Sequence, residues 1–119
     1  MNRNEHRPIH RRAADSVRGL AEGIRRERAV RTHLLLSAGA IIILAWIRPP
    51  VAWTLAVLVL IVVGLAAESL NGALEAMLDR LHPDENVEIG VAKDMASAAP
   101  FVIGCATAAA FVGAVVSSF

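Results

Sequence analysis

Four polar side chains recur at helical spacing in the second half of the sequence. They are separated by three or four residues: Glu68, Asn71, Glu75 and Asp79. At about 100° per residue they fall within about 80° of one another, so they share one face of a helix. Carboxylate and amide oxygens are the ligands that hard divalent cations prefer. This face therefore predicts a cation site or a path for cations or protons.

A second polar group follows a turn-like acidic segment, residues 81–86. After it, Lys93 and Asp94 open the next apolar run, and Lys93 is the single lysine of the chain. A lysine can meet a phosphate as a point charge. Phosphoryl transfer needs a metal ion, cationic stabilisation and a base for the attacking hydroxyl. The residue types leave two chemistries open: transfer of phosphate from ATP to a lipid hydroxyl, and transport of a cation or proton past Glu68 in an oligomer.

Composition excludes several classes of protein. With 55% hydrophobic and 19% charged residues in 119, the chain is too apolar to be disordered. Its one cysteine, Cys105, excludes an internal disulfide framework and a Cys-based zinc site. Neither GxxxxGK[ST] nor GxGxxG is present. The net charge of +1 hides nine arginines in residues 1–31, but so apolar a remainder leads us to expect no nucleic-acid partner.

Three runs without formal charge predict three transmembrane helices. Sixteen residues lie between Arg31 and Arg48 (the titratable His33 among them), 19 between Arg48 and Glu68, and 25 after Asp94. A spanning helix needs about 20 apolar residues, so the short first run must borrow a turn by snorkelling of its flanking side chains. A signal peptide is disfavoured, because a polar segment of about 33 residues precedes the first run. We assign the spans to about residues 32–48, 51–70 and 95–118.

The distribution of arginine predicts the orientation of the spans. Basic residues favour the cytoplasmic side, so the N-terminus is expected there and the C-terminus outside. Arg48-Pro49-Pro50 forms a tight external turn, because proline cannot continue a helix interior. Trp46 and Trp53 flank this turn as interfacial anchors. Residues 79–93 form a cytoplasmic loop.

The segment before the first span has the pattern of an amphipathic helix. Between Ala14 and Ala29, apolar Val17, Leu20 and Ile24 recur every three or four residues, and arginines fill the other faces. We expect residues 1–30 to form a cytoplasmic tail and a helix lying on the inner leaflet, with its arginines towards anionic headgroups. The alternative is a soluble basic helix that awaits a partner.

The carboxylates are expected to differ in their surroundings. A single helix from about Val51 to Arg80 would be about 45 Å long, whereas the hydrocarbon core is about 30 Å thick. Glu68 then lies at the inner membrane edge, where a carboxylate must face other helices or a polar crevice. Asp79, next to Arg80, is interpreted as a solvated carboxylate at a helix end. Asn71 is equally compatible with a helix–helix hydrogen bond.

Two stretches resemble a known family. Residues 68–80 read ESLNGALEAMLDR, and residues 92–99 read AKDMASAA. The pattern E-x-L-N-[ST]-A-[IL]-E-x-x-x-D, followed by A-K-D-x-x-[SA]-[AG]-A, is typical of the small prokaryotic diacylglycerol kinases. Upstream, residues 18–20 and 26–28 resemble the family's surface helix and the start of its first span. The resemblance covers about residues 11–119, and the pairing of both motifs at this distance is highly specific.

This resemblance implies an all-α integral membrane protein, 1–119 forming one lipid kinase domain. It further implies a homotrimer with active sites shared between subunits on the cytoplasmic side, and Mg²⁺ with ATP as co-substrate. Glu68 matches the catalytic carboxylate that takes the proton of the lipid hydroxyl. Glu27 and Glu75 match the metal-binding carboxylates, and Asn71 matches a polar residue of the active site.

The resemblance also implies contacts to both substrates. The residues expected to bind ATP are Asp15, Glu27, Glu75, Asp84, Glu85, Asn86, Lys93 and Asp94. The residues expected to bind the lipid are Ser16, Arg18, Arg31, Glu68 and Ser97.

Three positions depart from the family pattern. Gly72 stands where Ser or Thr is usual, which removes a hydroxyl and loosens an exposed helix by about 1 kcal/mol relative to Ala. Asp15 stands where an aromatic residue is common, and Pro8 stands near a basic position. The last two concern the nucleotide contacts near the N-terminus and leave the core site unchanged.

The resemblance gives two signals on the lipid substrate. Residues 25–33, RRERAVRTH, resemble members that act on undecaprenol, whereas the KDMASAA stretch resembles the diacylglycerol branch. We predict a kinase of the bacterial inner membrane that converts diacylglycerol to phosphatidate in phospholipid recycling. An undecaprenol kinase of the same family is the alternative, and a small oligomeric cation transporter is the third hypothesis.

Overall fold

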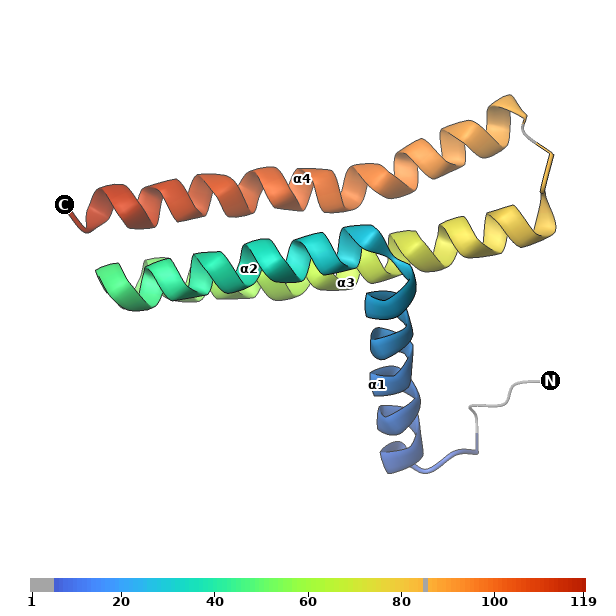
Figure 1. The fold of residues 1–119 in the computed structure, drawn as a ribbon, viewed down its shortest axis with the longest axis horizontal. Coiled ribbons are helices and arrows are strands. Elements are labelled where there is room, and N and C mark those ends of the chain that lie inside the picture. Colours follow the sequence, from blue (N-terminus) through green and yellow to red (C-terminus); the bar gives the residue numbers. More distant parts are fainter. Residues whose placement is uncertain (1–5, 85) are drawn as a thin grey trace.

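The computed structural model describes residues 6–84 and 86–119, and this part of the chain is helical without strands (Figure 1). The helices are α1 (Ile9–Arg26), α2 (Arg28–Ile47), α3 (Val51–Leu81) and α4 (Val87–Ser117). Helices α2, α3 and α4 lie side by side, and α1 turns away from them (Figure 1). The last three are long and apolar enough to cross a membrane. The expected all-α architecture with three candidate spans is confirmed.

The predicted turn between the first two spans is confirmed. Only Arg48, Pro49 and Pro50 separate α2 from α3. Arg48 adopts a left-handed conformation with φ 49°, and its N–H bonds to the carbonyl of Leu44 at 3.0 Å. Because a residue before proline avoids the right-handed helical region, the chain leaves α2 at this point.

The connection between α3 and α4 is shorter than the loop predicted for residues 79–93. Helix α3 ends at Leu81 and α4 begins at Val87. The side chain of Asn86 accepts the N–H of Ile89 at 2.9 Å, which caps α4 and starts it eight residues before the predicted third span. The 31 residues of α3 measure about 45 Å, as expected for a helix that outruns the bilayer.

The core of the bundle is small. Leu44, Val57, Ile61 and Ala114 pack together towards the end of the bundle that carries the turn at Arg48. Only 17%, 17% and 11% of the most apolar windows of the three long helices are buried within the chain. Because so much apolar surface is exposed, lipid or further protein must cover it.

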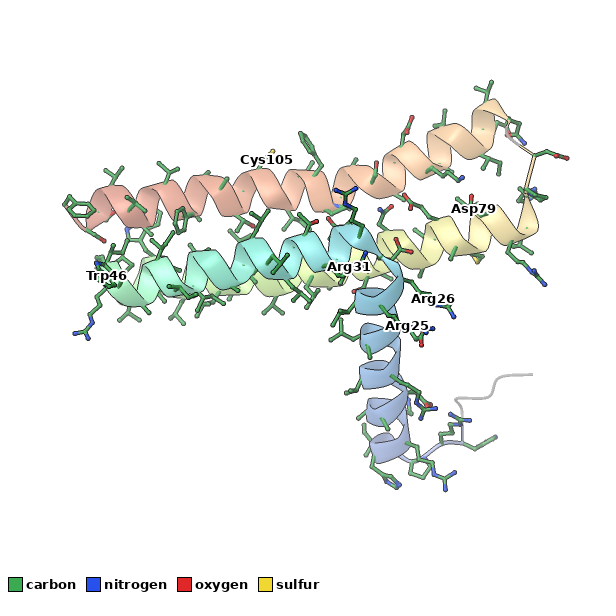
Figure 2. All side chains as sticks on the ribbon, in the orientation of Figure 1. Arg25, Arg26, Arg31, Trp46, Asp79 and Cys105 are labelled. Atoms are coloured by element: carbon green, nitrogen blue, oxygen red, sulfur yellow. The ribbon has the colours of Figure 1, made fainter. Side chains whose placement is uncertain are left out.

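The two tryptophans near the turn at Arg48 have different surroundings. Trp46 is 87% exposed and points away from the bundle, as expected for an anchor at the interface (Figure 2). The ring of Trp53 instead covers Gly113 of α4, where any Cβ would collide with it. Trp53 therefore packs α3 against α4 in addition to any contact with the interface.

The side chain of His33 on α2 contacts α3 beside Gly64. The Nε2 atom of His33 lies 2.9 Å from the backbone oxygen of Ile61, within hydrogen-bonding distance. One turn along α3, a Cβ added to Gly64 would lie 2.7 Å from Cε1 of His33. Gly64 thus leaves the space that this side chain occupies.

The α1–α2 junction consists of one residue in an extended conformation, Glu27 (φ −103°, ψ 113°). Beside it, Nη1 of Arg31 donates to the carbonyls of Ile24 at 2.9 Å and Arg25 at 2.8 Å (Figure 2). These carbonyls belong to the last turn of α1, which has no further helical N–H to bind them. Arg31 therefore caps α1, and its expected lipid contact stays a prediction.

Replacing Gly64 by Ala should loosen the packing of α2 on α3. The added methyl group must displace His33 from Ile61, so we expect the free energy of unfolding in detergent to fall by about 1–2 kcal/mol. Gly39→Ala is the control, because open space surrounds Gly39 in this chain. Equal thermal stabilities of the two variants would contradict this packing.

Replacing Arg31 by Gln should release the end of α1. We expect amide hydrogen exchange of residues 22–26 to accelerate by about tenfold, because two hydrogen bonds of about 1 kcal/mol are weakened. Arg31→Lys keeps the charge and loses the fork of donors, so it should show most of this effect. Unchanged exchange in both variants would show that Arg31 does not cap α1.

Candidate active site

The polar face of α3 takes the arrangement predicted from its spacing. Glu68, Asn71 and Glu75 are all half-buried. Nδ2 of Asn71 donates to Oε1 of Glu75 at 3.4 Å, so these two side chains face one another. Oδ1 of Asn71 is buried and has no hydrogen-bond partner in the described residues. Of the two alternatives for Asn71, a hydrogen bond to another helix is absent from the described residues, and its Oδ1 is left as an unpartnered acceptor.

Glu68 borders a cleft between α2, α3 and α4. The cleft has a volume of about 550 Å³. Its lining includes Arg28, Thr32, His33, Glu68, Pro100 and Gly104. The lining of this cleft is mostly apolar, but Arg28, Thr32 and His33 place polar groups in it with the Glu68 carboxylate, which would be costly to bury in lipid alone.

Sequence reasoning missed two residues of this cleft, Arg28 and Thr32. The signal was present, because Arg28, Thr32 and Leu36 follow at intervals of four residues and so share one face of α2. Pro100 was also missed. It has no N–H to continue the helical bonding of α4, and it faces the same cleft.

Glu27 lies against α3 at Gly72. A Cβ added to Gly72 would lie 2.9 Å from Cγ and 3.1 Å from Cδ of Glu27. Both residues line a smaller cleft of about 160 Å³ between the end of α1 and α3. Glu75 follows Gly72 by three residues, so Glu27 lies against the turn of α3 that precedes Glu75.

The other carboxylate of the small cleft, Glu22, is paired within α1. It bonds to Arg25 at 3.0 Å and to Arg26 at 2.8 Å. The hydrogen bond from Arg25, with a smaller contribution from Arg26, holds the pKa of the Glu22 carboxyl below its ordinary value. Its charge is thereby balanced locally.

Lys93 and Asp79 form an ion pair between α4 and α3, with Nζ 2.5 Å from Oδ1. Asp79 is exposed, as expected, but the pair corrects the interpretation that it is merely solvated beside Arg80 (Figure 2). The reason is tertiary: the short connection brings the start of α4 alongside the end of α3. Asp94 is exposed, and Ser97 Oγ donates to its carbonyl at 2.9 Å, the local bond open to a helical serine.

The expected contacts on α1 lie far from this region within one chain. Asp15 pairs with Arg7 and Arg18, and Ser16 Oγ donates to the carbonyl of Arg12. Twelve residues of helix separate Asp15 from Glu27, which is about 18 Å at 1.5 Å per residue. Asp84 and Asn86 lie in the α3–α4 connection, and Glu85 lies outside the described residues.

At the polar face of α3, the protein can offer a divalent cation only a small number of ligands. Within residues 6–84 and 86–119, no three His, Cys, Asp or Glu side chains converge on one point. Mg²⁺ needs only one or two carboxylates when phosphates and waters complete its octahedron. The carboxylates of Glu27 and Glu75 and the unpartnered oxygen of Asn71 fit that requirement.

Comparison with known proteins identifies the family. The model of the prokaryotic diacylglycerol kinase family matches residues 14–117, which is most of the chain. Neither the curated proteins nor the solved structures gave a match. The match agrees with the three long apolar helices and with the polar face of α3. It also supports the activity of a phosphotransferase that acts on a lipid. The chain is therefore a membrane protein that belongs to the prokaryotic diacylglycerol kinase family.

Proposed function

We propose that this protein transfers the γ-phosphoryl group of ATP to the hydroxyl of diacylglycerol, giving phosphatidate and ADP. The main support for this proposal is the position of Glu68. It borders the cleft that also contains Arg28, Thr32 and His33, at the point where the uncharged run of α3 gives way to its polar face. A lipid hydroxyl can reach that level from the bilayer, and ATP can reach it from water. The proposed site lies on the cytoplasmic side of the bacterial inner membrane, where the arginine-rich N-terminus is expected.

In this mechanism Glu68 is the base. Its carboxylate accepts the proton of the lipid hydroxyl as the hydroxyl oxygen bonds to the γ-phosphorus, and the bond from that phosphorus to the ADP oxygen breaks. A carboxylate is a weak base for an alcohol, so the acceleration must come chiefly from positioning. Lys93 offers a positive charge to the phosphates, and Asp79 holds its ammonium group at the edge of α3.

We propose that Glu27 and Glu75 hold Mg²⁺ and that Asn71 assists them. When bound, Mg²⁺ neutralises charge on the β- and γ-phosphates. Asn71 orients the Glu75 carboxylate through its Nδ2 and leaves Oδ1 free to accept a bond. The remaining nucleotide contacts proposed are Asp15, Asp84, Glu85, Asn86 and Asp94.

The proposed assembly is a homotrimer with shared sites. Asp15, Ser16 and Arg18 lie roughly 13–18 Å along α1 from the junction at Glu27, too far to join its site in the same chain. In an oligomer α1 can deliver them to a neighbouring site. The large exposed apolar surface of the three spans supports such an assembly.

A second candidate is phosphorylation of undecaprenol by the same residues. The observation that favours it is that His33 borders the cleft beside Glu68. His33 is also part of the stretch that resembles the undecaprenol-specific members. A transporter function is disfavoured by the family match.

A side-by-side assay tests the proposal. Purified protein is given ATP and Mg²⁺ with diacylglycerol or undecaprenol in mixed micelles, and the phosphorylated lipid is quantified. We expect transfer to diacylglycerol to have the higher kcat/KM. Higher kcat/KM with undecaprenol would select the second candidate, and no transfer to either lipid would refute the kinase.

Glu68→Gln should abolish the chemical step. We expect kcat to fall by about 10²–10⁴-fold, the usual contribution of a positioned base, while ATP–Mg²⁺ binding is kept. Asp79→Asn should instead raise the KM for ATP only a few-fold, because an exposed ion pair contributes at most about 1 kcal/mol. Loss of metal binding in Glu68→Gln with turnover spared would reverse the assigned roles.

A further inference from the structure

Gly72 is the place where the α1–α2 junction approaches α3 most tightly. It is buried although it lies on the long helix beside exposed Ala73. The three atoms closest to a Cβ built on it all belong to Glu27: Cγ at 2.9 Å, Cδ at 3.1 Å and Oε1 at 3.4 Å. The middle of the Glu27 side chain therefore occupies the volume that any other residue at position 72 would fill.

This close approach has a specific consequence for the Glu27 carboxylate. Contact at Cγ cannot be relieved by turning the end of the side chain alone, so a larger residue 72 must move the side chain as a whole. Gly39 and Gly104, also within spans, have no such neighbour within 4 Å. The constraint belongs to position 72 and not to helical glycines in general.

If the Glu27 carboxylate were displaced from Gly72, it would move relative to Glu75, the other proposed metal ligand. Glu75 follows Gly72 by three residues, so the two positions adjoin on the surface of α3. Asn71 fixes Glu75 at 3.4 Å and is itself half-buried, so Glu75 does not simply follow a moved Glu27. A shift of Glu27 away from Gly72 would therefore change its position relative to Glu75.

We propose that Gly72 is a positioning residue that seats Glu27 against α3 and thereby sets the affinity of the site for a divalent cation. The proposal rests on the proposed function for the role of Glu27 and Glu75, and it assigns a purpose to a residue that departs from the family's usual Ser or Thr. Gly72 itself touches neither cation nor substrate. It acts only through the backbone space it leaves to Glu27.

The test uses Mn²⁺ as the probe. Binding to the full-length protein in detergent, with a non-transferable ATP analogue present, is followed by electron paramagnetic resonance. We expect Gly72→Ala and Gly72→Ser to weaken Mn²⁺ binding by about tenfold, a loss common when a residue supporting a metal ligand is changed. Gly39→Ala should bind Mn²⁺ as the wild type does. Unchanged affinity in both Gly72 variants, or no Mn²⁺ binding by the wild type, would overturn the proposal.

A double-mutant cycle separates positioning from general damage. Glu27→Ala removes Cγ and the collision with it, so Gly72→Ala should raise the melting temperature more in that background than in the wild type. This readout is taken in EDTA and does not depend on the metal or on activity. Equal shifts in both backgrounds would show that residue 72 acts without Glu27 and would overturn the proposal.

The outcome is distinguishable from failure of the proposed function. If the wild type transfers phosphate to a lipid while the Gly72 variants keep the wild-type affinity for Mn²⁺, the positioning role alone fails. If no lipid is phosphorylated but Mn²⁺ binding depends on Gly72 through Glu27, the proposed reaction is refuted. The positioning of Glu27 by Gly72 is then still supported.

Discussion

The cost of placing a carboxylate in hydrocarbon governs this structure. A span of uncharged residues must cross about 30 Å of lipid, whereas α3 continues to about 45 Å without a break. A helix of this length leaves room for its polar face beyond the hydrocarbon. Glu68 borders a cleft in which α2 supplies the polar side chains of Arg28, Thr32 and His33. Membrane anchoring and the site depend on one helix.

Small residues determine how the other elements reach that helix. The α1–α2 junction approaches α3 over Gly72, and α2 approaches it over Gly64. In each case a polar side chain, Glu27 or His33, takes the place of the missing Cβ. Close approach through glycine is a general means of packing helices in lipid, where no hydrophobic force brings them together. In this protein the same device also sets polar groups at defined positions around the site.

Much of the fold was predictable from local patterns. Uncharged runs predicted the three long apolar helices, the Arg48-Pro49-Pro50 sequence predicted the turn between α2 and α3, and helical spacing predicted the shared face of α3. The missed features depend on residues distant in sequence. The Asp79–Lys93 pair requires the short α3–α4 connection, and the cap formed by Arg31 requires the break at Glu27. No periodicity encodes such contacts, because tertiary packing selects them after the helices have formed.

The central claim is that the end of the bundle where α1 joins and α3 outruns the bilayer carries the site. It is tested most directly in sealed proteoliposomes in which the protein has one orientation, established by labelling a cysteine placed at His82 in the α3–α4 connection. ATP and Mg²⁺ are supplied on one side of the membrane at a time. We expect phosphorylated lipid only when ATP is on the side of His82. Phosphorylation driven by ATP from the opposite side, that of the turn at Arg48, would contradict it.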